Sequence, residues 1–569
     1  MHQRAVSPAG LAVLLGVAYA ITLSAPAVAD LHPEEANNSL LAWTMQYRPP
    51  RWGFDLQYMS FCAGCTATGW LGSVTASVFG DGLVAWKLVP ALFASAFAAA
   101  VLSLSPDGRR AAVPALVLVM APQLYTELSV IAWGNHIESM STAFLGFALI
   151  QRGRGRLTDA LGGAALGVSL WLALTSLPLV VAAVAMSLPD PRRLALIGPG
   201  LALFVVFWGL QHHIAGQHPF ALLDYAQAWT TPTTVGAGLA QLADPALVGA
   251  TFGPRLHDQP LGLLAAATLP VAMWLGRRDP AVRALSLAAA LWCVAFVLSP
   301  FRLSYGAPDS PLRGYDLRYA VPLVMIATAL LGRTACLAPP RASAALLAPW
   351  LLSGAVGRAD TWAAVHPSHL YDRPAVDWRW VERNAIPRQA AWFASLTPDQ
   401  PRSTAVRSFA AGVLAARAGE PIGTARSSAT LRGVGASLPR CPDEPIRCHL
   451  SHPSLTDLRE DERKIALRSH AWRHHTNLPL HGPAPADDEV GRVIAWVTGM
   501  AAGARYGTPS RQPTPFPSWI DTPHGVLWAQ GLATRAYDRW GALAAAPHPS
   551  WPPRVREAYA STLQRIDLD

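Results

Sequence analysis

Apolar segments long enough to cross or nearly cross a bilayer recur along the first 357 residues of this chain. About 20 helical residues span the roughly 30 Å hydrocarbon core of a membrane. We therefore expect an all-α polytopic membrane protein with about 11 transmembrane helices. The eleven segments cover residues 8–29, 83–104, 112–133, 137–150, 159–175, 177–188, 194–210, 261–275, 284–300, 319–331 and 342–356.

Charged residues are distributed unevenly between the two parts of the chain. Residues 1–356 carry 36 Asp, Glu, Lys or Arg, whereas the last 213 residues carry 45. A soluble domain has roughly 25% charged residues, so only the second part approaches the composition of a domain in water. The sequence predicts a transmembrane domain over residues 1–356 and a mainly α-helical extracytoplasmic domain over residues 357–569.

Basic loops give the orientation, because short loops rich in Lys and Arg stay in the cytoplasm. Alternate loops hold 13 basic residues in about 42, whereas the opposite loops, 30–82, 211–259 and 301–318, hold six in about 120. We expect a multi-pass protein of the bacterial inner (cytoplasmic) membrane, with a cytoplasmic N-terminus and a periplasmic C-terminal domain. Ala27-Val28-Ala29 also fits a signal-peptidase site, but the long apolar stretch and the many later spans favour a retained first helix.

The formal net charge of +9 does not indicate a nucleic-acid partner. It is divided nearly evenly, with +4 before residue 357 and +5 after it, and no long basic run occurs.

The cysteines agree with this topology, since disulfides persist in oxidising compartments. Cys62 and Cys65 fall in the first outer loop, and Cys441 and Cys448 fall in the outer domain. We expect a local disulfide in each pair.

Glycine and alanine recur in three helical stretches of the C-terminal part, which begin at Gly412, Gly499 and Gly531. They allow two helices to approach closely, as in a stack of helical hairpins. A chain rich in both residues could also show them by composition alone.

Ionisable residues at the outer ends of the spans are the candidates for function, because a charge in a membrane is costly without a partner. Glu34 and Glu35 open the first outer loop, where they could act as a general base or simply begin a solvated helix. Lys87, one of two lysines, lies about one turn inside the second span. It could snorkel to the surface or bind an anionic headgroup.

The sequence around Lys87, from Gly80 to Leu92, resembles the start of the second helix in the GT-C superfamily of integral-membrane glycosyltransferases. That superfamily carries an Asp-Glu pair in its first outer loop, often after His-Pro, and Glu34 stands here where Asp is commoner. Further similar segments follow in the expected order: His32-Pro33-Glu34-Glu35, Pro122, Gly134-Asn135-His136-Ile137-Glu138, and Arg318-Tyr319-Ala320-Val321-Pro322. The last resembles the branch that contains protein mannosyltransferases and lipid A aminoarabinose transferases.

This resemblance implies an inverting, hexosyltransferase-type transfer of a sugar from a polyprenyl-phosphate carrier to an acceptor hydroxyl on the outer face. Glu34 would be the base, with Glu35 as its neighbour or orienter. Lys87 and Arg318 would stabilise the leaving phosphate. Tyr319 could pack on the carrier or sugar, and His136 and Glu138 could bind the acceptor or a cation, or cap a helix.

The expected partners are a polyprenyl-phosphate-linked sugar donor, a glycan, lipid or protein acceptor, and membrane lipid. The residues indicate no certain cofactor and no metal ligand set, although a divalent cation could take part.

Two other functions fit the sequence. A transporter or flippase of a lipid-linked substrate usually carries charged or helix-breaking residues in mid-span, which are scarce here. A structural membrane subunit whose outer domain binds cell-wall material would not need Glu34 or Lys87.

Overall fold

The computed structural model describes most of the chain, and every regular element in that part is a helix, as the sequence predicts. The described residues are 8–25, 35–36, 38, 41–42, 45, 63–80, 83–106, 110–153, 155–214, 235–254, 259–298, 317–363, 381–382, 386–388, 390–395, 401–422, 426–438, 452–474, 484–506, 517–540 and 551–568.

The chain forms two compact units. Unit 1 comprises Met1–Tyr305 and Ser310–Tyr371, and unit 2 comprises Gly306–Asp309 and Asp372–Asp569. Helix α18 continues to Ala363, past residue 356, the predicted end of the membrane domain.

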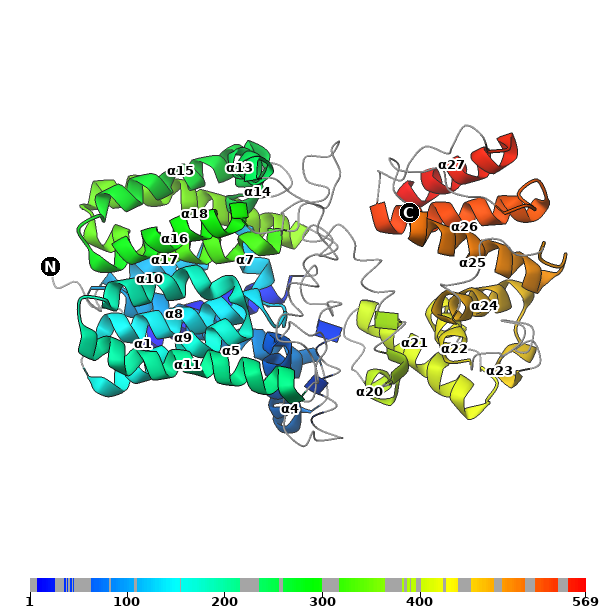
Figure 1. Cartoon of the computed structure of the whole chain (residues 1–569), viewed down its shortest axis with the longest axis horizontal. Helices are drawn as coiled ribbons and strands as arrows, with labels where there is room; N and C mark the ends of the chain where they lie inside the picture. The colour runs from blue at the N-terminus through cyan, green and yellow to red at the C-terminus, as the bar shows by residue number, and fades with distance from the viewer. Residues whose placement is uncertain are drawn as a thin grey trace. The chain divides into compact units, whose positions relative to one another are not determined.

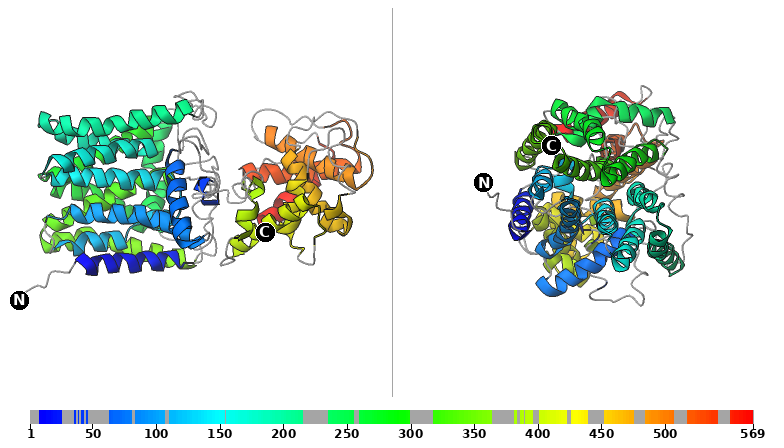
Figure 2. Two further views of the ribbon diagram at one scale, coloured as in Figure 1. Left: turned by 90° about the horizontal axis from the view of Figure 1, so that it is seen from below. Right: turned by 90° about the vertical axis from the view of Figure 1, so that its left-hand side faces the viewer.

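Unit 1 is a bundle of apolar helices that lie side by side, with α4 running across one end (Figures 1 and 2). Within the part of the chain that the structure describes, four stretches are long and apolar enough to cross a membrane: Val84–Ser103, Pro191–Ile214, Pro280–Leu298 and Leu317–Leu337. The helices are α1 (Pro8–Leu23), α4 (Ala63–Phe79), α5 (Leu83–Ser103), α6 (Ala112–Val119), α7 (Gln123–Leu128), α8 (His136–Arg152), α9 (Arg156–Leu172), η2 (Leu174–Ser176), α10 (Leu177–Ser187), α11 (Pro191–Ile214), α13 (Val235–Ala243), α14 (Pro245–Phe252), α15 (Gln259–Leu275), α16 (Pro280–Leu298), η3 (Leu317–Ala320), α17 (Val321–Leu337) and α18 (Pro340–Ala363).

One predicted span is wrong as a continuous helix. Residues 112–133 form the short helices α6 and α7, with a break at Pro122, whose φ of −51° and ψ of 149° are extended. Proline has no N–H to donate, and its ring disfavours a helical conformation of the residue before it. Helices α4, α13 and α14 lie within segments predicted as outer loops, so these loops contain helices.

Glycines bring α8, α9 and α11 into close contact. A Cβ on Gly163 would overlap the backbone of Ile197, and a Cβ on Gly167 would overlap the carbonyl of Gly200. Small residues four apart allow this kind of approach between helices in membranes. The bundle therefore holds together through backbone contact as well as through its apolar side chains.

Of the described cysteines, Cys65 is disulfide-bonded, whereas Cys293 and Cys336 are not in a disulfide. Cys62, Cys441 and Cys448 lie outside the described residues. The two predicted pairings therefore stay predictions.

Unit 2 is a series of helices in which chain neighbours pack on one another (Figure 1). Its elements are η5 (Ile386–Arg388), α20 (Ala390–Ser395), α21 (Pro401–Ala418), α22 (Ser428–Ser437), α23 (Pro453–Thr456), α24 (Glu460–His474), α25 (Glu489–Tyr506), α26 (Pro523–Trp540) and α27 (Pro553–Leu568). Phe409, Val434, Leu467 and Trp528 are among its buried side chains.

The contact between α21 and α22 is reciprocal. A Cβ on Gly412 would overlap the carbonyl oxygen of Thr430, and a Cβ on Gly433 would overlap the carbonyl oxygen of Phe409. In each helix the glycine follows the residue with the contacted carbonyl by three positions. The two helices thus use the same pattern against each other.

The contact between α25 and α26 repeats this pattern. Gly499 meets the carbonyl of Trp528, and Gly531 meets the carbonyl of Trp496, again with a spacing of three. The close approach predicted at these glycines is confirmed. Unit 2 contains the same kind of helical hairpin twice.

We expect Gly412→Ala to destabilise unit 2, although alanine favours a helix by roughly 0.5–1 kcal/mol over glycine. The added Cβ meets backbone, which cannot move aside, and overpacking costs about 1–3 kcal/mol. Thermal unfolding of the purified chain measures the change. The neighbouring exposed residue supplies the control, because Ala411→Gly should show only the loss of helix propensity. A more stable Gly412→Ala protein would contradict the packing.

Candidate active site

The loop over residues 129–135, between α7 and α8, organises the candidate site. All of its residues except Asn135 are buried, although it is not helical. Buried backbone groups require hydrogen-bond partners, and here side chains from distant parts of the chain supply several of them. The Tyr19 hydroxyl, from α1, donates to the carbonyl of Ser129 over 3.2 Å.

A buried ion pair joins this loop to two other segments. Lys87 Nζ lies 2.6 Å from Glu35 Oε2, and the two residues are 4% and 0% exposed. The same ammonium donates to the carbonyl of Val130 over 3.3 Å, and the other Glu35 oxygen accepts from the Ala132 N–H over 3.1 Å. Lys87 does not snorkel to the surface, because its charge is satisfied inside the protein.

Asn38, from the same segment as Glu35, fixes the next part of the loop. Its Nδ2 donates to the carbonyls of Ala132 and Trp133, each over 2.9 Å. Its Oδ1 is buried with no partner among the described residues. An acceptor of this kind is suited to a hydroxyl or a cation.

Glu138 holds the end of the loop where α8 begins. Its Oε1 accepts from the Gly134 N–H over 2.8 Å, while Oε2 is buried without a partner in the described part of the chain. Gly134 has a φ of +88° and lies against the backbone of Cys65 in α4, where a Cβ would not fit. One oxygen of Glu138 thus contacts the backbone at the start of α8, and the other has no partner among the described residues.

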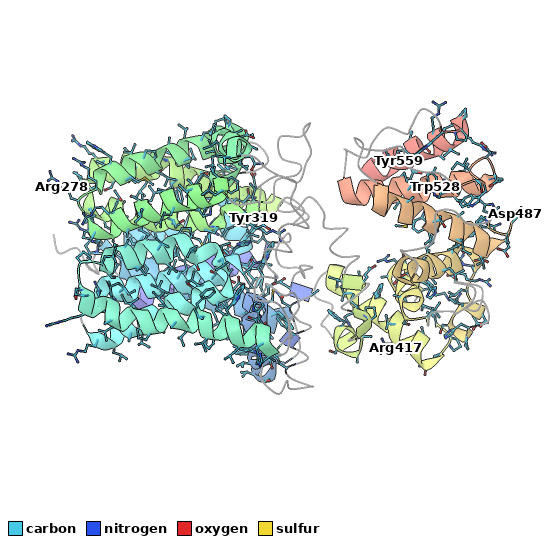
Figure 3. All side chains as sticks on the ribbon, in the orientation of Figure 1. Arg278, Tyr319, Arg417, Asp487, Trp528 and Tyr559 are labelled. Carbon is cyan, nitrogen blue, oxygen red and sulfur yellow. The ribbon has the colours of Figure 1, made fainter. Side chains whose placement is uncertain are left out.

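Arg318 and Tyr319, in η3, lie over the same loop. The Arg318 guanidinium is 5.4 Å from the ring centres of both Trp133 and Tyr319, within the range of a cation–π contact. The ring of Tyr319 meets that of His136 edge to face at 5.2 Å. Figure 3 shows Tyr319 at the end of unit 1 opposite to Arg278.

The structure brings six of the seven sequence-predicted site residues to this loop and the start of α8. They are Glu35, Lys87, His136, Glu138, Arg318 and Tyr319. Glu34 lies outside the described residues, so its role as a base stays a prediction. The structure adds Asn38 and Trp133, which are not among the sequence-predicted site residues. Their positions in the sequence could have indicated them, because Asn38 lies in the acidic segment and Trp133 directly precedes Gly134-Asn135.

The described residues contain no group of three or more His, Cys, Asp or Glu that could hold a metal ion. Glu138 Oε2 and Asn38 Oδ1 are oxygen atoms of the type that hard cations bind.

Several solved structures are similar to this chain. ArnT from Cupriavidus metallidurans bound to undecaprenyl phosphate is 15% identical, with 98% of this chain and 89% of that chain covered and a TM-score of 0.43. The Archaeoglobus fulgidus oligosaccharyltransferase, in complex with zinc and sulfate, is also 15% identical, with coverages of 68% and 56% and a TM-score of 0.36. At these TM-scores the likeness carries no information about site or reaction. No protein-family model and no curated protein matches the chain.

We expect Glu35→Gln to lower the free energy of unfolding by about 3–5 kcal/mol, because it leaves the Lys87 ammonium buried without its counter-charge. Adding Lys87→Met to that variant should restore part of the loss, since no buried charge then remains. Thermal unfolding in detergent measures both.

Asp461→Asn is the matched control, because its ion pair with Arg459 is exposed and should contribute less than about 1 kcal/mol. A double variant less stable than Glu35→Gln alone would refute this account of the pair.

Proposed function

We propose that this protein is a membrane glycosyltransferase of the GT-C kind, which transfers a hexosyl-type sugar from a polyprenyl-phosphate carrier to an acceptor hydroxyl with inversion. The observation that carries the proposal is the buried Lys87 ammonium, held by Glu35 and the 129–135 loop at the same end of the bundle as Tyr319. A fixed cation in a site of low polarity stabilises an anion far more than one in water does.

The leaving group of this reaction is a lipid phosphate, which gains negative charge as the sugar departs. A lysine ammonium has three N–H donors. Glu35 and Val130 accept two of them in the described structure, so the third is available for a phosphate oxygen. Arg318 supplies a second cation over the same loop.

The two acidic residues have different roles in this proposal. Both oxygens of Glu35 are engaged, one by Lys87 and one by the Ala132 N–H. A carboxylate held in this way orients the lysine and is poorly placed to take a proton. We therefore assign the general base to Glu34.

The remaining polar atoms are suited to the sugar or the acceptor. Glu138 Oε2 and Asn38 Oδ1 would accept hydrogen bonds from hydroxyl groups. Tyr319 and His136 add two aromatic rings that meet edge to face at the start of α8. These residues form the proposed binding surface for the sugar or the acceptor.

The orientation from the basic loops completes the proposal. The site would face the periplasm from the inner membrane of a bacterium, with the N-terminus in the cytoplasm and unit 2 outside. Carrier lipids with the sugar on the outer leaflet would reach Lys87 from the membrane.

The test incubates the purified full-length protein with radiolabelled polyprenyl-phosphate sugars and candidate acceptors, and follows release of the carrier phosphate. We expect Glu34→Gln to lower turnover by roughly 10²–10⁴ with donor binding largely kept. We expect Lys87→Ala to weaken both donor binding and turnover, because the phosphate is charged in both the ground state and the transition state.

Lys464→Ala provides the control, since it removes the only other lysine and lies in unit 2. Full transfer activity in both site variants would sink the proposal. Movement of the intact lipid-linked sugar across a vesicle membrane, without bond cleavage, would identify a flippase instead.

A further inference from the structure

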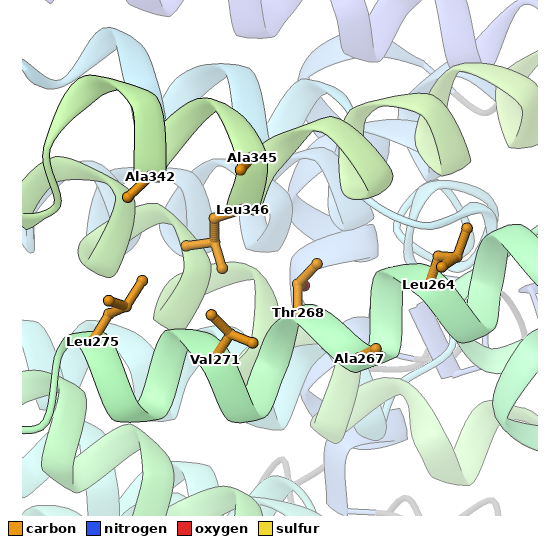
Figure 4. Close-up of a pocket in the computed structure, with 8 residues that line it drawn as sticks. All are labelled: Leu264, Ala267, Thr268, Val271, Leu275, Ala342, Ala345 and Leu346. Carbon is orange, nitrogen blue, oxygen red and sulfur yellow. The ribbon is translucent and has the colours of Figure 1, made fainter.

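A groove on the outside of unit 1 lies between α15 and α18 (Figure 4). Its volume is about 310 Å³, which is within the lower range of ligand sites in proteins. The groove exists because alanines stand where larger side chains would fill it: Ala267 on α15 and Ala342 and Ala345 on α18. Ala267 and Ala345 are exposed, so the groove is open along its side.

The wall of the groove is apolar except for one side chain. Its one polar side chain is Thr268, whose hydroxyl donates to the carbonyl of Ala265 in its own helix over 2.6 Å. Leu264 and Val271, both about half exposed, form part of its edge. A hydrocarbon chain can be buried on this surface without leaving a polar group unpaired, whereas a polar ligand would lose its hydrogen bonds there.

The length of the groove matches one leaflet of a bilayer. It runs from Leu264 to Leu275 along α15, and at 1.5 Å per residue this distance is about 16 Å. The hydrocarbon core is roughly 30 Å thick, so half of it is about 15 Å. A chain from a lipid of a single leaflet therefore fits from end to end.

Arginines gather at the Leu275 end of the groove. Arg277 and Arg278 follow α15 directly, Arg341 precedes Ala342, and all three are exposed. Arg277 lies over the ring of Trp274 at 4.6 Å, and this tryptophan is 62% exposed. Tryptophan beside arginine is typical of the level of the lipid headgroups.

The nearby acidic residue does not cancel this charge. Asp279 is paired with Arg333 of α17, with Nη2 and Oδ2 2.6 Å apart. Burial acts to raise the pKa of the Asp279 carboxyl, but the hydrogen bonds from Arg333 and nearby backbone N–H groups outweigh it and hold that pKa below its usual value. Asp279 stays ionised and engaged, which leaves the three arginines for another anion.

We propose that this groove binds one anionic phospholipid, with an acyl chain between α15 and α18 and the phosphate at Arg277, Arg278 and Arg341. Basic clusters between membrane helices are suited to such headgroups. The site is distinct from the candidate active site, because Figure 3 places Arg278 and Tyr319 at opposite ends of unit 1. A carrier lipid with its phosphate at Lys87 would have its headgroup at the wrong end. This inference does not depend on the proposed function.

Native mass spectrometry of the full chain, released from nanodiscs of equal phosphatidylglycerol and phosphatidylcholine, tests the proposal. We expect one phosphatidylglycerol to be retained in preference to phosphatidylcholine. Arg277→Gln with Arg341→Gln should reduce that retention roughly tenfold or more, because each arginine near a headgroup contributes to binding. Ala267→Phe with Ala345→Phe should abolish it by filling the groove.

Two matched controls separate these effects from general changes in the protein. Arg192→Gln removes an exposed arginine at the start of α11, and Ala202→Phe adds a ring on an exposed face of the same helix. Both should retain the lipid as the unchanged chain does. Equal retention of the two phospholipids, retention unaffected by the groove variants, or displacement of phosphatidylglycerol by added polyprenyl phosphate would each overturn the proposal.

Discussion

The buried pair of Lys87 and Glu35 is the interaction on which the candidate site depends. A buried ion pair is stable only if further hydrogen bonds satisfy the remaining donors and acceptors of both side chains. The 129–135 loop supplies these hydrogen bonds from Val130 and Ala132. The loop in turn could not be buried without such partners. The pair and the loop therefore stabilise each other, and the other site residues attach to the same loop.

Glycine determines how closely the helices of both units approach. In unit 1, Gly163 and Gly167 let α9 rest on the backbone of α11. In unit 2, one glycine on each helix meets a backbone carbonyl of the other helix, and these contacts join α21 to α22 and α25 to α26. Membrane helices gain little from apolar burial against one another, so backbone contact matters more there. In unit 2, glycine-to-carbonyl contacts form a helical hairpin of the same kind in α21–α22 and in α25–α26.

The two ends of unit 1 present different chemistry. At one end, Lys87 and Arg318 lie among aromatic rings and buried acceptor oxygens. At the other, Arg277, Arg278 and Arg341 lie at the end of an open apolar groove. The first arrangement suits a phosphate whose increasing negative charge is stabilised in a site without water. The second suits a phosphate that is only bound at the membrane surface.

The sequence by itself determined the helical class, the apolar helices and most of the polar residues that meet at the site. These follow from composition and from the resemblance around Lys87. Pro122 marks the break in residues 112–133, but the sequence could not give the helix α4 across the end of the bundle, because apolar composition does not distinguish a span from a crosswise helix. Only the tertiary structure decided that Lys87 is paired inside the protein, since its partner lies 52 positions away and the carbonyl of Val130 lies 43 positions away. The sequence alone does not show whether a charged side chain at the end of a span contacts water or pairs with a carboxylate.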